Sequence, residues 1–190
     1  MSYVNIASIR RCTQAEGPGK RFAVWFQGCN RRCRGCCNEQ MQPLKPRMVM
    51  DVLELTKVIA EARDEHGIEG ITLLGGEPVL QAAGAAELAE WCQKESLSVL
   101  TFSGYKLAEL QAMDDGAVRK LLDCTDILVD GPFIEELYDT SRDWVGSMNQ
   151  EVIYLTKRYK PGMEYTNGEH RIEMHFRKDR IYVNGWPCVQ

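Results

Sequence analysis

The stretch RFAVWFQGCNRRCRGCC, residues 21–37, joins an apolar strand pattern to a cluster of cysteines. Residues 21–28 are rich in aromatic and aliphatic side chains, which favours a buried strand. The chain then enters a loop with four thiols, at Cys29, Cys33, Cys36 and Cys37. In parallel α/β sheets, ligands and chemistry are found at the carboxyl ends of the strands. The sequence therefore predicts a thiol-rich functional loop at the end of a sheet strand.

Composition and charge narrow the class of protein. The chain has 190 residues, of which 44% are hydrophobic and 26% charged, as expected for one globular domain with at most a small appendage. The net charge of −4 gives no indication of direct nucleic-acid binding. No apolar run approaches the roughly 20 residues that span a bilayer. Residues 1–12 lack the pattern of a signal peptide, so we expect a cytoplasmic protein without membrane contact.

Cysteine usage supports a metal or a catalytic role for the loop. The chain contains eight cysteines, and reducing compartments disfavour structural disulfides. Half of them lie in the loop; the others are scattered, at Cys12, Cys92, Cys124 and Cys188. We expect these four to be small buried hydrophobic residues.

Strand and helix patterns alternate along most of the chain. Apolar residues at helical spacing over 50–66 are followed by Gly67, a suitable helix C-cap. Further strands are predicted over 68–74, 97–102 and 126–130, and further helices over 82–95 and 107–122, the last interrupted at 114–116. This order indicates right-handed βαβ units and a mostly parallel sheet. After residue 150 we expect strands without helices, with a turn at 178–180 closing a terminal hairpin.

Four unusual segments each follow a predicted strand. They are the cysteine loop, GGEP at 75–78, SGY at 103–105 and DGPF at 130–133. The carboxyl ends of parallel strands share one edge of the sheet. We therefore expect these four segments to converge at one site.

The CxxxCxxC spacing of Cys29, Cys33 and Cys36 allows three thiolates to reach one compact metal centre. A structural zinc ion is bound by four protein ligands that complete its coordination shell, usually as two separated pairs in the sequence. A [4Fe–4S] cluster can be bound by thiolates from a short run of cysteines. Three protein ligands leave one iron free to bind a substrate or cofactor. Cys37 could supply a fourth ligand, so a zinc site remains an alternative, as do free or redox-active thiols.

The stretch GPGKRFAVWFQGCNRRCRGC, residues 17–36, resembles the opening of the radical S-adenosylmethionine (SAM) activating enzymes of glycyl-radical proteins. In that superfamily the three-cysteine motif holds a [4Fe–4S] cluster, and SAM binds the open iron through its amino and carboxylate groups. GGEP is similar to the segment that contacts the SAM amino group. Further stretches, TFSGYKLAEL (101–110), DILVDGPF (126–133) and WVGSMNQ (144–150), resemble the activating proteins of anaerobic ribonucleotide reductase.

The resemblance covers roughly residues 3–150 and implies an α/β fold, a truncated radical SAM (β/α) partial barrel. We expect this domain to span residues 1–154 and a β-rich C-terminal extension to span residues 155–190. The extension exceeds the length expected of the shortest family members.

The resemblance also implies roles for individual residues. The cluster ligands would be Cys29, Cys33 and Cys36. The implied SAM contacts are Gly35, Cys36 and Cys37 near the adenine; Gly75, Gly76, Glu77 and Pro78 at the amino end; Ser103 and Gly104 at the ribose or carboxylate; and Asp130 at a cation or a SAM hydroxyl. Cys37 departs from the aromatic residue or histidine that often follows the last cluster cysteine, and leaves a spare thiol.

The implied activity is the reductive cleavage of SAM, followed by formation of a glycyl radical on a large partner, the anaerobic ribonucleotide reductase. A flavodoxin-like or ferredoxin-like electron donor is implied as well. No catalytic side-chain acid–base pair is required beyond the cluster and SAM. Two alternatives are a radical SAM enzyme acting on a small molecule or peptide, similar to 7-carboxy-7-deazaguanine synthase, and a non-enzymatic zinc or iron–sulfur module.

Overall fold

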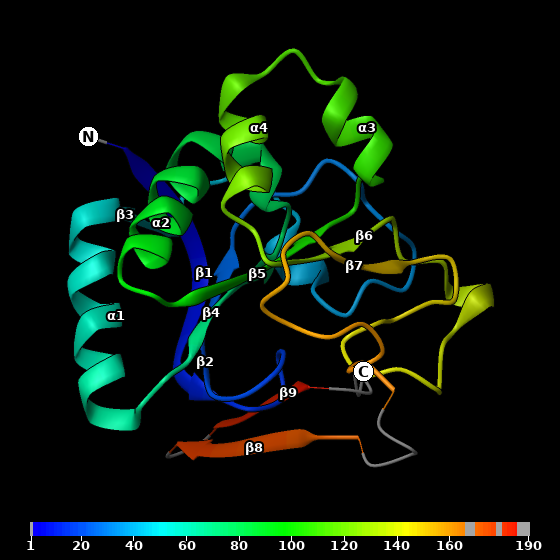
Figure 1. The fold of residues 1–190 in the computed structure, drawn as a ribbon. Coiled ribbons are helices and arrows are strands. Elements are labelled where there is room, and N and C mark those ends of the chain that lie inside the picture. Colours follow the sequence, from blue (N-terminus) through cyan, green and yellow to red (C-terminus); the bar gives the residue numbers. More distant parts are fainter. Residues whose placement is uncertain (1, 166–169, 178–179, 186–190) are drawn as a thin grey trace.

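The computed structural model describes residues 2–165, 170–177 and 180–185. Figure 1 shows a central sheet with helices packed along one side of it. The strands of this sheet are β1 (Tyr3–Thr13), β2 (Arg21–Phe26), β3 (Met48–Asp51), β4 (Gly70–Gly75), β5 (Ser98–Ser103), β6 (Ile127–Asp130) and β7 (Glu151–Tyr154). The α-helices are α1 (Val52–His66), α2 (Ala82–Lys94), α3 (Leu107–Ala112) and α4 (Gly116–Asp123). Short 3₁₀ turns are η1 (Glu39–Met41), η2 (Pro78–Gln81) and η3 (Glu135–Leu137).

The centre of the sheet is parallel and its edges are antiparallel. Within the described residues the strand order is β3-β1-β2-β4-β5-β6-β7, and β2, β4, β5 and β6 run parallel to one another. This confirms the predicted mixed α/β fold with a mostly parallel sheet. The sequence did not predict β1 or β3, which pair antiparallel at one edge. The predicted helix over 50–66 begins at Val52, because Met50 belongs to β3 and the Asp51 side chain caps the helix by accepting from the Leu53 N–H at 2.8 Å.

The register of the parallel strands aligns their carboxyl ends. Phe26 at the end of β2 pairs with Gly75 at the end of β4, and Ser103 at the end of β5 pairs with Asp130 at the end of β6. The segments that follow these strands therefore all leave the sheet at the carboxyl-terminal ends of its parallel strands. This confirms the expected convergence of the cysteine loop, GGEP, SGY and DGPF.

Strand β2 is buried on both faces, which explains its continuous apolar sequence. Phe22, Val24 and Phe26 pack with residues of α1 and α2 in the main core. Ala23 and Trp25 point to the opposite face and pack with Leu74 and other residues. The second face is the one that carries the candidate site.

A buried arginine connects the amino-terminal ends of the parallel strands by hydrogen bonds. Arg21 is fully buried, and its guanidinium donates to Thr72 Oγ1 at 2.7 Å, Ser98 Oγ at 2.9 Å and the Ile71 carbonyl. The Tyr159 hydroxyl lies 3.4 Å from the same guanidinium and 2.7 Å from Ser98 Oγ. The segment after β7 is therefore fixed to the core of the sheet.

The C-terminal strands β8 (Ile172–Arg177) and β9 (Arg180–Gly185) form an antiparallel pair, as predicted. Figure 1 shows this pair below the connection between β1 and β2. The Gln14 N–H donates to Glu173 at 2.7 Å, Asn184 Nδ2 donates to Thr13 Oγ1 at 3.0 Å, and the Gly185 N–H donates to Glu16 at 2.9 Å. Residues 178–179 of the predicted turn, and Cys188, lie outside the described residues.

Of the other scattered cysteines, Cys92 is fully buried, as predicted, whereas Cys12 and Cys124 are half-buried. No helix in the described part of the chain is long and apolar enough to cross a membrane.

We predict that Tyr159→Phe lowers the free energy of unfolding by about 1 kcal/mol, because it removes the hydroxyl bonded to Arg21 and Ser98. Urea denaturation of the wild type and the variant measures the difference. Tyr165→Phe is the matched control, because the Tyr165 side chain is 57% exposed and its loss of a hydroxyl should leave stability unchanged. Equal stability of all three proteins would contradict the role given to Tyr159.

Candidate iron–sulfur and cofactor site

A cavity of about 970 Å³ lies on the sheet face opposite α1 and α2. Trp25, Leu74 and Phe102 from the central strands line its sheet side. All four loop thiols border it, at Cys29, Cys33, Cys36 and Cys37. Gly75, Gly76 and Glu77, and Ser103 and Gly104 border it as well. The structure therefore brings most of the predicted site residues to one cavity.

The three motif cysteines differ in burial from the fourth. Cys29 is buried, Cys33 and Cys36 are half-buried, and Cys37 is exposed. The Arg31 N–H donates to Cys29 Sγ and the Asn38 N–H donates to Cys36 Sγ, each at 3.4 Å. Burial raises the pKa of the Cys29 and Cys36 thiols, and these N–H donors partly oppose it. Amide donors aimed at sulfur are suited to a thiolate that holds a cluster.

The placement of the thiols around one cavity suits the ligands of a cluster. Among the described residues, no group of three His, Cys, Asp or Glu side chains is placed to hold one metal ion. A cubane cluster binds each thiolate through a different iron, so its ligands must border one cavity rather than surround one point. Cys29, Cys33 and Cys36 meet that requirement.

Arginines of the loop connect it to neighbouring segments. The Arg31 guanidinium lies over the Tyr105 ring, 4.5 Å from its centroid, and 3.9 Å from a carboxylate oxygen of Glu109. Arg34 lies 3.5 Å from Glu135 of η3. The loop is thus held against the SGY segment on one side and η3 on the other.

The GGEP turn packs directly on the entrance to the cysteine loop. The Gly76 N–H donates to the Phe26 carbonyl and the Glu77 N–H donates to the Gly28 carbonyl, both at 2.8 Å. A Cβ on Gly76 would lie 2.2 Å from the Gly28 carbonyl oxygen. Gly75 has φ +103°, which glycine adopts without strain. The two glycines therefore allow the backbones of the turn and the loop to touch.

Glu77 connects the GGEP turn to the SGY segment. Its carboxylate accepts from Ser103 Oγ at 3.1 Å, the Val79 N–H at 3.1 Å and the Gly104 N–H at 2.7 Å. The residue is 1% exposed, and burial raises its pKa to about 7 although these donors act in the opposite direction. Glu77 thus fixes two of the predicted cofactor segments relative to each other.

Two predicted cofactor contacts lie outside the cavity lining. The buried Asp130 carboxylate accepts from the Leu107 N–H at 2.6 Å and from Lys106 Nζ at 3.0 Å, which fixes the start of α3. Its neighbour Gly131 borders the cavity, but Asp130 does not. Pro78 is buried at the start of η2 and does not border the cavity either.

Sequence reasoning missed the cavity wall formed by β1 and the C-terminal hairpin. Ser8 and Arg10 of β1, Glu16 after it and residues 181–185 all line the cavity. Burial raises the pKa of Glu16 to about 7. The alternation of polar Ser8 and Arg10 with apolar Ile9 spans only three residues, which is too short to predict a strand.

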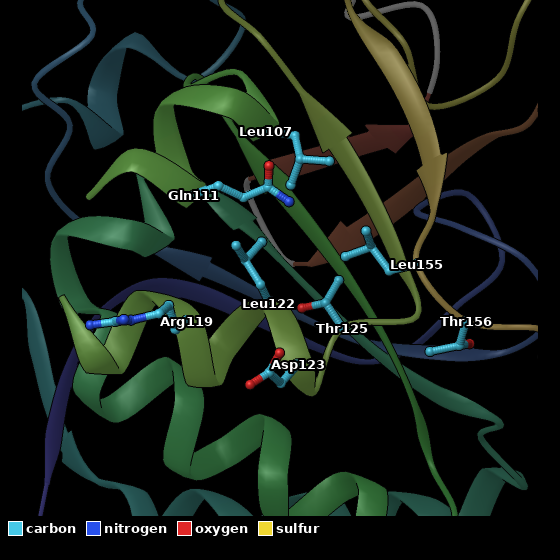
Figure 2. Close-up of a pocket in the computed structure, with 8 residues that line it drawn as sticks. All are labelled: Leu107, Gln111, Arg119, Leu122, Asp123, Thr125, Leu155 and Thr156. Carbon is cyan, nitrogen blue, oxygen red and sulfur yellow. The ribbon is translucent and has the colours of Figure 1, made fainter. Parts of the chain in front are cut away.

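A second cavity of about 390 Å³ lies between α3, α4 and the segment after β7. Figure 2 shows Leu107, Leu122 and Leu155 around the same space. Its lining contains no cysteine, histidine or glutamate among the residues the structure describes. The loop thiols therefore border the larger cavity and not this one.

We predict that Gly76→Ala lowers the free energy of unfolding by about 1–3 kcal/mol and reduces iron loading, because the new Cβ forces the turn away from Gly28. Chemical denaturation and iron analysis after anaerobic reconstitution measure both effects. Gly116→Ala is the control: a Cβ there meets nothing within 4 Å, so stability and iron content should not fall. Wild-type stability and iron content in Gly76→Ala would show that the close approach is unnecessary.

Comparison with known proteins gives a consistent family assignment. The profile of the family described as 4Fe-4S single cluster domain matches residues 15–153. The chain is 33% identical over 147 residues to the anaerobic ribonucleoside-triphosphate reductase-activating protein of Vibrio cholerae, covering 74% of this chain and 91% of that protein. It is 31% identical over 140 residues to the protein of the same name from Haemophilus influenzae, with 70% and 87% covered. The Escherichia coli K12 protein of that name is 30% identical over 145 residues, with 73% and 91% covered. The chain therefore belongs to the family of anaerobic ribonucleoside-triphosphate reductase-activating proteins and contains its 4Fe-4S single cluster domain.

Proposed function

We propose that this chain is a radical SAM activase that generates a glycyl radical on an anaerobic ribonucleotide reductase. The observation that carries the proposal is the cavity shared by the three motif cysteines, the GGEP turn and the SGY segment. The names of the relatives from Vibrio, Haemophilus and Escherichia, which describe reductase activation, support the choice of partner.

In this proposal Cys29, Cys33 and Cys36 hold a [4Fe–4S] cluster. Their amide donors, from Arg31 and Asn38, reduce the cost of placing thiolates in a partly buried site. Cys37 is exposed beside them and is left out of the ligand set. Three thiolate ligands would leave one iron of the cluster without a protein ligand and available to SAM.

SAM would occupy the part of the cavity between the cysteine loop and the GGEP turn. Its amino end would lie at Gly75, Gly76 and Glu77. Ser103 and Gly104 would border the ribose or carboxylate, and the backbone of Gly35, Cys36 and Cys37 would border the adenine. The cavity volume of about 970 Å³ lies at the upper end of the roughly 300–1,000 Å³ that is typical of ligand-binding sites. Asp130 and Pro78 would support these contacts from behind the cavity wall.

A cluster held by Cys29, Cys33 and Cys36 would supply the electron for reductive cleavage of the SAM carbon–sulfur bond, chemistry that would end in removal of a hydrogen atom from a partner glycine. The residues of this chain would bind and orient SAM and shield it from water. Glu77 holds the GGEP and SGY segments together, while Trp25, Leu74 and Phe102 form an apolar side that limits water. A flavodoxin-like or ferredoxin-like protein would supply the electron.

The fold is proposed to be a truncated radical SAM (β/α) partial barrel, in which the parallel strands β2, β4, β5 and β6 form the curved core. Residues 1–154 would be the radical SAM domain and residues 155–190 a β-rich extension. The family profile ends at residue 153, which supports this division.

The test compares two cysteine variants after anaerobic reconstitution with iron and sulfide. With dithionite and SAM, the wild type and Cys37→Ala should bind about four irons per chain and produce 5′-deoxyadenosine. Cys33→Ala should fold but lose the stable cluster, with 5′-deoxyadenosine reduced about tenfold or more. Iron and sulfide analysis, absorbance and product quantification measure the outcome.

Each contrary result has a distinct meaning. A full cluster in Cys33→Ala would overturn the ligand assignment. Loss of metal in Cys37→Ala would favour a four-thiolate site of the zinc type. A stable cluster without SAM cleavage, even with the reductase present, would favour a module that only carries electrons.

A further inference from the structure

The β8–β9 pair borders the cluster cavity along one strand. Residues 181–185, five consecutive residues of β9, line the cavity, whereas no residue of β8 does within the described part of the chain. Side chains of a strand alternate between its two faces. A cavity that touches consecutive residues therefore runs along the backbone edge of β9. This strand lies after the family profile, which ends at residue 153.

The hydrogen bond of Gly185 shows which backbone groups point to this edge. Gly185 is the register partner of Ile172, but its N–H donates to Glu16 Oε1 at 2.9 Å. In an antiparallel ladder, alternate residues direct their N–H and C=O groups toward the partner strand and away from it. Val183 and Ile181 lie two and four positions before Gly185. Their N–H and C=O groups therefore also point away from β8.

The edge is open in the described structure. Within residues 2–165, 170–177 and 180–185, β9 pairs with β8 alone, and the main chain of Ile181 and Val183 makes no hydrogen bond to another segment. Ile181 and Val183 are 62% and 43% exposed. Open strand edges are templates for the addition of another strand.

Both faces beside the edge are suited to an added strand. On one face, Met174 and Phe176 are exposed opposite Val183 and Ile181, which gives an apolar surface for side chains. On the other face, Asn184 borders the cavity, and its buried Oδ1 has no hydrogen-bond partner among the described residues. A two-stranded pair is marginally stable alone, and a third strand would add main-chain hydrogen bonds.

We propose that the open edge of β9 binds an extended, glycine-bearing segment of the reductase as a third β-strand. The inference rests on the proposed function, because it names how the partner of that reaction enters the site. One cavity joins the β9 edge to the cysteine loop, so a segment bound along β9 continues toward the cluster. Main-chain pairing accepts glycine, which has no side chain to fill a pocket.

Hydrogen–deuterium exchange on the full-length, cluster-loaded protein with SAM and the purified reductase from the same organism tests the proposal. We expect the amides of Ile181 and Val183 to exchange more slowly in the complex than in the activase alone. Unchanged exchange at both amides in a complex that protects other surfaces would overturn the proposal. Protection that depends on activase concentration without reductase would also overturn it, and would assign the edge to a second copy of this chain.

Substitutions at Val183 separate the backbone edge from the side chain. Val183→Pro removes the outward N–H, and proline is tolerated at an edge position of this kind. It should weaken reductase binding about tenfold, while Val183→Ala, which keeps the N–H, should weaken it less than about threefold. Equal weakening by both would overturn the role of the backbone. Circular dichroism and thermal unfolding check that both variants fold, and the exchange experiment on the wild type decides the proposal independently.

The proposed function is tested separately by SAM cleavage in the wild type without reductase. Failure of that cleavage, together with failure of radical formation when reductase is added, would remove the proposed function. Wild-type cleavage and radical formation with unprotected β9 amides would instead remove only the docking proposal.

Discussion

The site depends on the direct contact between two backbones, the GGEP turn and the entrance to the cysteine loop. The Gly76 and Glu77 N–H groups donate to the carbonyls of Phe26 and Gly28, and no side chain could stand between Gly76 and Gly28. Two segments almost 50 residues apart in sequence are thereby placed at one cavity. Glu77 extends the connection to Gly104, so the cysteine loop, GGEP and SGY form one continuous wall.

Much of this arrangement could be predicted because its signals are local. The apolar run of β2, the cysteine spacing and the GGEP turn identify a parallel α/β sheet with chemistry at its carboxyl ends. Strands β1 and β3 were missed because their antiparallel pairing links Tyr3 to Asp51, and short sequence windows do not reveal such long-range partners. Asp130 was expected at the cofactor, but Lys106 and the Leu107 N–H occupy its carboxylate, a pairing that depends on the turn into α3.

The segment after residue 153, where the family profile ends, also lines the cavity. Tyr159 fixes its first part to Arg21 beneath the sheet, and Glu16 and Thr13 fix the β8–β9 pair beside β1. This segment thus borders the same cavity as the thiols, through residues 181–185. Its described residues contribute to the shape of the cavity, and under the docking proposal they offer a strand edge to the partner.

The most direct test of the central claim is electron–nuclear double resonance on the reduced, cluster-loaded protein mixed with SAM that carries nitrogen-15 at its amino group. If three cysteines leave one iron open beside the GGEP turn, the amino nitrogen should bind that iron and show a hyperfine coupling to the cluster spin. A spectrum identical to that with unlabelled SAM, at saturating SAM, would contradict the account and leave the thiols as ligands of a closed centre.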